Sequence, residues 1–202
     1  MLLYFPMIIG VDMDSVIAEI IRPIDLFHNR QYGTNITYDD HESYDLRLYW
    51  NCSLEDMYRR IFEFYDSPEF EETKPVAGSQ SALGILAEDH ELHLITARPY
   101  DVEAQSRKWL DKHFPRIFKE IHHTNLISKG GKETSVKKSE ICRKMGATVM
   151  IDDHIDYILD CAESAITSYL FPAPWNRGKK IVHPRIRQIT GWEEAVELIN
   201  GL

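Results

Sequence analysis

Short apolar runs alternate with helix-like segments along most of the chain, and this alternation constrains the fold more than any other feature. Met7 to Val11 is a continuous apolar run, and further strand candidates follow at residues 92–96, 148–151 and 167–171, with a weaker candidate at 120–124. Such runs are typical of parallel strands that are covered on both faces. Strands that alternate with helices predict an α/β fold with a doubly wound, Rossmann-like parallel sheet.

The segments between these runs carry helical periodicity and helix-end signals. Candidate N-caps are Ser79, Asp101 and Ser135, and Gly146 is a candidate C-terminal stop. A final helix is predicted around Trp192, Val196 and Ile199.

Residues 17–77 break the alternation and contain no convincing strand. Ser53 begins a clear amphipathic helix, and an earlier helix is predicted from about Val16 to Tyr32, kinked near Pro23. The segment holds 13 Asp/Glu and 6 Lys/Arg, which is −7 of the net charge of −9. We therefore expect a core domain of residues 1–16 and 78–202 with a helical cap, residues 17–77, inserted after the first strand.

Composition excludes several classes of protein. The chain has 202 residues, 44% apolar residues and 27% charged residues, which is ordinary for a globular domain. Its net charge of −9 disfavours nucleic acid polymers and anionic membranes as partners. Three separated cysteines favour a reducing cytoplasm, and no run approaches the roughly 18 apolar residues of a membrane span. The apolar start lacks a basic leading region, so we expect a buried strand there rather than a signal peptide.

Pairs of carboxylates follow two of the predicted strands. Asp12 and Asp14 follow the first strand, and Asp152 and Asp153 follow the run at 148–151. Ligand sites of open α/β sheets lie beyond the carboxyl ends of the strands, and carboxylate oxygens suit Mg²⁺. Two nearby carboxylates can also divide the roles of nucleophile and general acid. The alternative for each pair is an ordinary helix N-cap.

Two further features are suited to an anionic group at the same edge. Thr96 ends the strand at 92–96 and Ala97 follows it, and at such a strand end a hydroxyl and backbone amides can hold a phosphate oxygen. Lys137 and Lys138 stand near a helix start, where a cation opposes the helix dipole and so suggests another role. Solvated surface lysine and an ordinary turn are the alternatives.

Taken together, these residues resemble the haloacid dehalogenase (HAD) superfamily of phosphohydrolases, whose motifs are Asp-x-Asp, Ser/Thr, Lys and Asp-Asp. The matching residues are Asp12, Asp14, Thr96, Lys138, Asp152 and Asp153. The resemblance implies that Asp12 is the nucleophile and Asp14 the acid and base. It also implies that Thr96, Ala97 and Lys138 hold phosphate. The resemblance further implies that Asp12, the Asp14 backbone carbonyl and Asp152 bind Mg²⁺. Asp153 is then either a further ligand or a residue that contacts a ligand. Lys138 is preferred to Lys137 for its spacing to Asp152.

Three segments resemble more narrowly the cytosolic type-C 5′(3′)-deoxyribonucleotidases and their bacterial nucleotidase relatives. They are the residues Glu42–Leu46, the turn Thr96–Pro99 and the segment Pro172–Arg177. This resemblance implies a cytoplasmic Mg²⁺-dependent phosphomonoesterase that acts on nucleoside monophosphates. A phosphatase for another small metabolite, such as a sugar phosphate, and a catalytically silent binding module remain alternatives. The oligomeric state stays open.

The remaining polar features have ordinary interpretations. The basic segment that contains Arg177, Lys179, Lys180, Arg185 and Arg187 is expected to be a solvated loop. Gly130–Gly131–Lys132 lacks the spacing of a P-loop and is expected to be a turn. The nine histidines show no metal-binding spacing, so we expect them to be ordinary core or surface residues.

Overall fold

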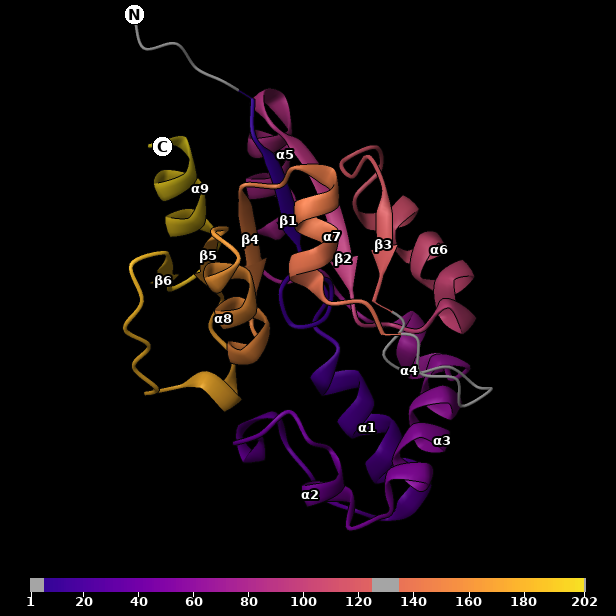
Figure 1. Cartoon of the computed structure of the whole chain (residues 1–202). Helices are drawn as coiled ribbons and strands as arrows, with labels where there is room; N and C mark the ends of the chain where they lie inside the picture. Colours follow the sequence, from indigo (N-terminus) through magenta and orange to yellow (C-terminus); the bar gives the residue numbers. More distant parts are fainter. Residues whose placement is uncertain (1–5, 125–134, 202) are drawn as a thin grey trace, which may run out of the picture.

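A six-stranded parallel sheet forms the centre of the molecule (Figure 1). The computed structural model describes residues 6–124 and 135–201. The strand order is β3-β2-β1-β4-β5-β6 and every pairing is parallel. The strands are β1 (Ile8–Val11), β2 (Glu91–Thr96), β3 (Ile121–His123), β4 (Val149–Asp152), β5 (Thr167–Leu170) and β6 (Ile186–Gln188). The predicted doubly wound α/β fold is confirmed.

Helices cover both faces of this sheet. One face packs against α5 (Ser79–Asp89), α6 (Glu103–His113) and α9 (Trp192–Asn200). The other packs against α7 (Lys138–Met145) and α8 (Ile155–Glu163), which lie in front of the sheet in Figure 1. Because both faces are buried, the central strands need apolar side chains at successive positions, which accounts for the continuous runs in the sequence.

The strand order reverses between β1 and β4, which are hydrogen-bonded neighbours. Gly10 lies at the centre of this region, where a Cβ atom would come within 2.8 Å of Ile95 Cδ1 and 2.9 Å of Met150 Sδ. Val11 pairs with Leu94 on one side and Ile151 on the other. The residues that follow β1, β2 and β4 therefore emerge together at one edge, which is the usual ligand position in this class of sheet.

Residues 17–77 form helices beyond the carboxyl ends of the strands (Figure 1). The helices are α1 (Ile21–Tyr32), α2 (Arg47–Trp50), α3 (Leu54–Tyr65) and α4 (Pro68–Glu71), with the 3-10 turn η1 (Tyr38–Asp40). They share an apolar cluster around Phe27, Trp50 and Phe64, to which Val102 also belongs. The two ends of the segment meet, since Glu19 N donates to Lys74 O and Val76 N donates to Ile17 O. The division into core and cap domains remains a prediction.

Several predicted helix ends are confirmed. Ser53 caps α3, because its side chain accepts a hydrogen bond from Asp56 N. Gly146 ends α7 with a left-handed φ of 76°, a conformation that glycine adopts without strain.

Other predicted ends are wrong. Helix α1 begins at Ile21 rather than Val16, and Pro23 lies in its first turn, where a missing N–H has no helical partner to lose. Gly78 rather than Ser79 is the cap residue of α5, Asp101 lies in the 3-10 turn η2 (Tyr100–Val102), and Lys137 rather than Ser135 precedes α7.

The basic segment is predicted to be a loop, and this prediction is wrong for its last residues. Ile186–Gln188 forms the edge strand β6, and the 3-10 turn η3 (Pro174–Asn176) precedes the segment. Only one of the three residues of β6 is buried, so it carries no apolar run. The predicted turn Gly130–Gly131–Lys132 lies outside the described residues, as do Met1 to Phe5. Within residues 6–124 and 135–201, no helix has the length and apolar character needed to cross a membrane.

Candidate active site

Asp12 is the first residue after β1 and lies at the centre of the site. Its backbone N–H donates to Ile151 O over 2.9 Å, which continues the pairing of β1 with β4 by one residue. The carboxylate is buried, with 7% of the residue exposed. The chain then turns sharply through Ser15, whose φ of 64° is uncommon for a residue with a side chain.

Lys138 joins the ends of β1 and β4. Its Nζ lies 2.6 Å from Asp12 Oδ1 and 2.7 Å from Asp152 Oδ2. All three side chains are nearly or fully buried. Lys137, the alternative weighed from sequence, points elsewhere and contacts Asp160 Oδ1 at 2.7 Å. Of the two lysines, only Lys138 therefore belongs to the buried cluster.

Asp153 completes a group of three buried carboxylates. One oxygen from each of Asp12, Asp152 and Asp153 lies within 4.8 Å of the others. Burial raises the pKa of Asp12 to about 7, with Lys138 opposing the shift and Asp152 adding to it. The pKa of Asp153 is also raised well above its usual range, first by burial and then by Asp152 and Asp12. One ammonium does not neutralise three buried carboxylates, so the all-oxygen donor set fits an added divalent cation such as Mg²⁺.

Asp14 lies apart from this cluster, against Arg98. Arg98 Nη2 lies 2.6 Å from Asp14 Oδ1, and its Nε donates to both oxygens at 3.0 and 3.1 Å. The guanidinium is buried and also donates to Ser106 Oγ at 3.0 Å. Sequence reasoning noted the turn at Arg98 but gave this residue no function. A basic residue just beyond a strand end, opposite an acidic pair, was the available signal.

Thr96 and Ala97 lie where the sequence predicted, at the carboxyl end of β2. Thr96 is fully buried and its Oγ1 accepts a hydrogen bond from Arg98 N at 3.1 Å. Ala97 is partly buried. The register of β1 with β2 puts this turn beside the Asp12–Asp14 segment. The structure thus brings the seven predicted residues to one edge of the sheet, and the side chain of Asp14 stands outside the group of three carboxylates.

The inserted segment, residues 17–77, contacts the site at two places. The Arg98 guanidinium faces the rings of Tyr65 and Phe70, with its Cζ atom 5.6 and 5.3 Å from their centroids. On the other side, the ring of Tyr44 lies 4.0 Å from that of His154, which directly follows Asp153. Neither contact was predicted, since each joins residues distant in sequence whose types alone suggest no pairing.

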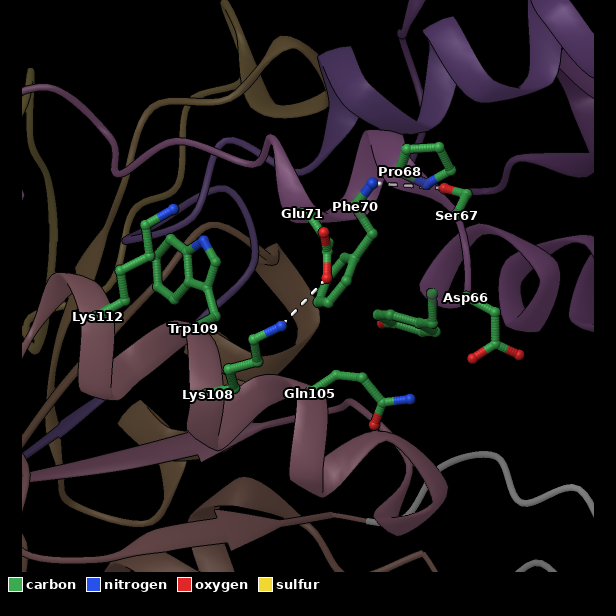
Figure 2. Close-up of a pocket in the computed structure, with 10 residues that line it drawn as sticks. Asp66, Ser67, Pro68, Phe70, Glu71, Gln105, Lys108, Trp109 and Lys112 are labelled. Atoms are coloured by element: carbon green, nitrogen blue, oxygen red, sulfur yellow. Dashed lines mark hydrogen bonds and ion pairs between the residues drawn. The ribbon is translucent and has the colours of Figure 1, made fainter.

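A cavity of about 560 Å³ lies between α4 and α6 (Figure 2). Its lining includes Tyr65, Gln105, Lys108 and Trp109, and Lys108 Nζ lies 3.1 Å from Glu71 Oε1 across it. None of the seven predicted site residues lines this cavity. The lining of this cavity therefore does not overlap with the carboxylate cluster.

Comparison with known proteins shows the family of the chain. The family model described as 5′ nucleotidase, deoxy (Pyrimidine), cytosolic type C protein matches residues 6–201. The chain belongs to this family. A 5′(3′)-deoxyribonucleotidase of Bacillus phage SPbeta is 26% identical over 189 residues, which cover 93% of this chain and 95% of the phage protein. YqfW, a candidate nucleotidase of Bacillus subtilis, is 24% identical over 196 residues, covering 96% of this chain and 93% of that protein.

The fold of this nucleotidase-family member is that of the HAD hydrolases. The candidate HAD hydrolase YfnB of Bacillus subtilis superimposes with a TM-score of 0.65 at 13% identity, over 97% of this chain and 99% of that one. The YfnB structure is described as bound to magnesium. The predicted superfamily and the predicted enzyme class are confirmed: the protein is a HAD-type nucleotide phosphatase, a phosphoric monoester hydrolase.

Proposed function

We propose that this nucleotidase removes phosphate from (deoxy)nucleoside monophosphates, depends on Mg²⁺ and forms an aspartyl-phosphate on Asp12. The observation that carries the proposal is the buried contact of Lys138 with both Asp12 and Asp152 at the point where the strand order reverses. Lys138 occupies Oδ1 of Asp12, so we assign the attack on phosphorus to Oδ2. The family's cytosolic description supports a cytoplasmic location.

Asp12, Asp152 and Asp153 would hold the cation, together with the backbone carbonyl of Asp14. Bound there, Mg²⁺ supplies positive charge that screens the carboxylates and the phosphoryl oxygens from one another. Burial and the neighbouring carboxylates raise the pKa values of Asp12 and Asp153, and a bound cation would oppose both effects, which supports this assignment.

Three residues would hold the phosphoryl group during transfer. Lys138 keeps its ammonium at the nucleophile, and although burial alone would lower its pKa, Asp12 and Asp152 outweigh burial and raise it. The lysine is therefore charged throughout the working pH range. The Thr96 hydroxyl and the Ala97 backbone N–H would donate to phosphoryl oxygens. Charge neutralisation and alignment of this kind are the main protein contributions to phosphoryl transfer.

Asp14 would handle the protons of both half-reactions. It would first protonate the leaving ester oxygen and then take a proton from the water that attacks the aspartyl-phosphate. Arg98 contacts both oxygens of Asp14. The acid step requires one of these oxygens to carry a proton and face the substrate. We therefore expect one oxygen to turn to the substrate while Arg98 keeps its contact with the other oxygen, which fixes the orientation of the carboxyl group.

The substrate class follows from the family and is consistent with the inserted helices. The phage relative is named as acting on deoxyribonucleotides. Residues 17–77 carry a net charge of −7, which disfavours long polyanions over a small monophosphate. The Tyr44–His154 contact packs the insert against the loop that carries Asp153. Closure at this contact would exclude water while the phosphoryl group is transferred.

Phosphate release from a substrate panel tests the proposal. The panel holds ribo- and deoxynucleoside 5′- and 3′-monophosphates together with sugar phosphates, each assayed with Mg²⁺ and with EDTA. We expect Mg²⁺-dependent release that is fastest for a nucleoside monophosphate. Mg²⁺-dependent release that is fastest for a sugar phosphate would keep the mechanism and reject the substrate class. Release that is unchanged by EDTA would reject the metal.

A phosphate-analogue experiment separates an active enzyme from a silent binding module. Beryllium fluoride with Mg²⁺ should bind wild-type protein at Asp12 and protect it against thermal unfolding. The variant Asp12→Asn should lose this protection together with phosphate release. A variant that retained wild-type turnover would disprove the aspartyl-phosphate.

A further inference from the structure

A second group of potential metal ligands lies on β2 and β3, away from the carboxylate cluster. It consists of His93, Glu120 and His122, which offer one ligand atom each within 4.8 Å of one another. His93 pairs with Gly10 in the register of β2 with β1, and Ile95 pairs with His122 in the register of β2 with β3. Alternation along the strands therefore puts all three side chains on the sheet face that carries Ile95.

The two imidazoles already point at each other. His93 Nδ1 lies 2.9 Å from His122 Nε2, and the rings are inclined by only 23°. Two imidazole nitrogens on one tetrahedral ion at about 2.05 Å each are separated by about 3.3 Å. A few tenths of an ångström of separation, with rotation of the more exposed His122 ring, would therefore admit an ion. Glu120 Oε2 lies 3.7 Å from His122 Nε2, within reach as the third ligand.

The far side of His93 has the partner that metal-binding histidines usually have. Its Nε2 lies 2.9 Å from Glu91 Oε1, and Lys119 Nζ holds the other oxygen of Glu91 at 2.5 Å. A hydrogen bond from Nε2 to this carboxylate leaves the lone pair on Nδ1, the atom that faces His122. Carboxylate–histidine pairs of this kind orient metal ligands and increase their basicity.

We propose that His93, His122 and Glu120 bind a divalent transition-metal ion of the Zn²⁺ class. Imidazole nitrogen with one carboxylate favours Zn²⁺, Ni²⁺ or Cu²⁺, whereas the all-oxygen cluster at Asp12 favours Mg²⁺. The two sites thus select different ions by ligand chemistry. His93 is buried, while His122 and Glu120 have 24% and 63% of their side chains exposed, which leaves water a way to the ion.

Metal binding here would link the short strand β3 to its neighbour β2. Strand β3 has three residues and pairs only with β2 among the described strands. Its last residue, His123, lies with Nδ1 2.9 Å from Arg98 O, in the turn that carries Thr96 and Ala97. An ion that joins β2 to β3 would stabilise the folded state in proportion to its occupancy.

Zn²⁺ binding to the full chain tests the proposal. Calorimetric titration in excess Mg²⁺ would be run on wild type, His122→Ala, Glu120→Gln and Asp152→Asn, with His183→Ala as the matched histidine control. We expect one Zn²⁺ per wild-type chain. Binding should weaken at least about tenfold in His122→Ala and less in Glu120→Gln, since one ligand is lost or neutralised. Asp152→Asn and His183→Ala should bind as wild type does.

Two results would overturn the site. One is the absence of Zn²⁺ binding by wild type in excess Mg²⁺, and the other is equal binding by wild type and His122→Ala. Loss in Asp152→Asn with retention in His122→Ala would assign the ion to the carboxylate cluster instead. Thermal unfolding without metal checks that His122→Ala is folded. Phosphate release in Mg²⁺ should be the same in His122→Ala and wild type, so the result is independent of the proposed nucleotidase mechanism.

Discussion

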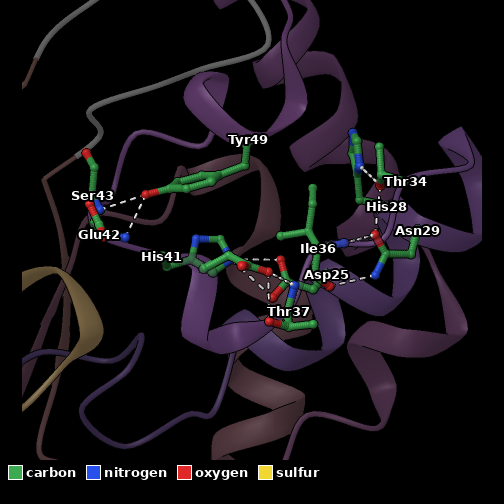
Figure 3. A network of polar contacts seen from close by, with 11 residues as sticks. Asp25, His28, Asn29, Thr34, Ile36, Thr37, His41, Glu42, Ser43 and Tyr49 are labelled. Carbon is green, nitrogen blue, oxygen red and sulfur yellow. Dashed lines mark hydrogen bonds and ion pairs between the residues drawn. The ribbon is translucent and has the colours of Figure 1, made fainter.

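Buried polar groups are satisfied differently at the sheet edge and within the inserted helices. In the insert, Asp25 accepts from His41 Nε2 at 2.9 and 3.1 Å, and the Asn29 side chain both accepts from Ile36 N and donates to Ile36 O (Figure 3). The Tyr49 hydroxyl accepts from two successive backbone N–H groups, at Glu42 and Ser43. Here each of these acceptors has a donor from the same segment.

At the sheet edge, the buried carboxylates outnumber the cations that contact them. Asp12, Asp152 and Asp153 share the single ammonium of Lys138, and the pKa of two of the three carboxyls is raised. The Asp25 carboxylate has its donor within the insert, whereas an added cation would balance the sheet-edge cluster. Unbalanced burial of charge is costly, and it is concentrated at functional sites. Substitutions in the two regions should therefore affect different properties of the protein.

The largest effect is expected for Asp12→Asn. The variant lacks the nucleophile, so phosphate release should fall by at least about 10³-fold. Its melting temperature without metal should match or exceed that of wild type, because one of three crowded carboxylates becomes neutral. Steady-state assays and thermal unfolding check both parts. A melting temperature several degrees below that of wild type would contradict the view that the cluster is electrostatically unbalanced.

The converse behaviour is expected for Asp25→Leu in the insert. Removing the acceptor leaves His41 buried without its partner, which should cost about 3 kcal/mol of unfolding free energy. Turnover per folded molecule should stay close to wild type, since the side chain of Asp25 bonds to His41 within the insert. Asp25→Asn, which keeps an acceptor oxygen, is the matched control and should cost less. Denaturant unfolding gives the free energy of unfolding, and assays on a known amount of folded enzyme give kcat. A loss of kcat without a loss of stability would contradict the expected difference between the two regions.

Low pH should reduce the folding stability of the insert because His28 becomes protonated. Burial lowers the pKa of His28 to about 4, with Arg60 adding to the shift, from an ordinary value near 6.5. The unfolded chain therefore takes up this proton first, so the stabilisation is complete above pH 6.5 and is lost as the pH falls toward 4. Between pH 6.5 and 5 the loss should be about 1.5 kcal/mol. His28→Gln should show a correspondingly smaller decline in denaturant unfolding over this range, and parallel curves for the two proteins would exclude His28 as the cause.

The same contrast explains which features sequence could predict. Strands β1 and β4 carry nearly continuous apolar runs, and β2 carries three apolar residues, because helices cover both faces, and such patterns are visible without a structure. Strand β6 escaped because it lies at an edge and only Ile186 is buried. Helix starts were missed where the cap is a residue such as Gly78 or Lys137, which makes no side-chain capping bond.

Within the site, the sequence predicted which residues lie at the sheet edge, but not which side chains pair with one another. Parallel strands end at one edge, so residues that follow them converge whatever their partners are, and this placed Asp12, Thr96 and Asp152 together. Spacing alone left Lys137 and Lys138 open, and the distance to Asp12 separates them. The pairing of Arg98 with Asp14 joins residues 84 positions apart and depends on side-chain direction, which the sequence pattern does not contain.

Arg98 connects the two regions and should show the smallest effect. It contacts Asp14 on one side and faces Tyr65 and Phe70 of the insert on the other. Arg98→Lys keeps the charge but loses the planar fork that contacts both carboxylate oxygens. We expect kcat to fall about tenfold with little change in KM, since Asp14 loses its fixed orientation rather than its chemistry. The acidic limb of the kcat–pH profile should shift with it, which a merely structural role would not cause.

The control for Arg98 is Arg107→Lys on α6, where the arginine pairs with Glu103 at the surface. That variant should keep wild-type kcat and pH profile, because exposed ion pairs contribute little. If Arg98→Lys also behaves as wild type, Asp14 is oriented without the guanidinium, and the insert then has no chemical connection to the proton-transfer group. If Arg98→Lys lowers kcat while leaving the pH profile unchanged, Arg98 supports the packing of the insert but does not position the proton on Asp14.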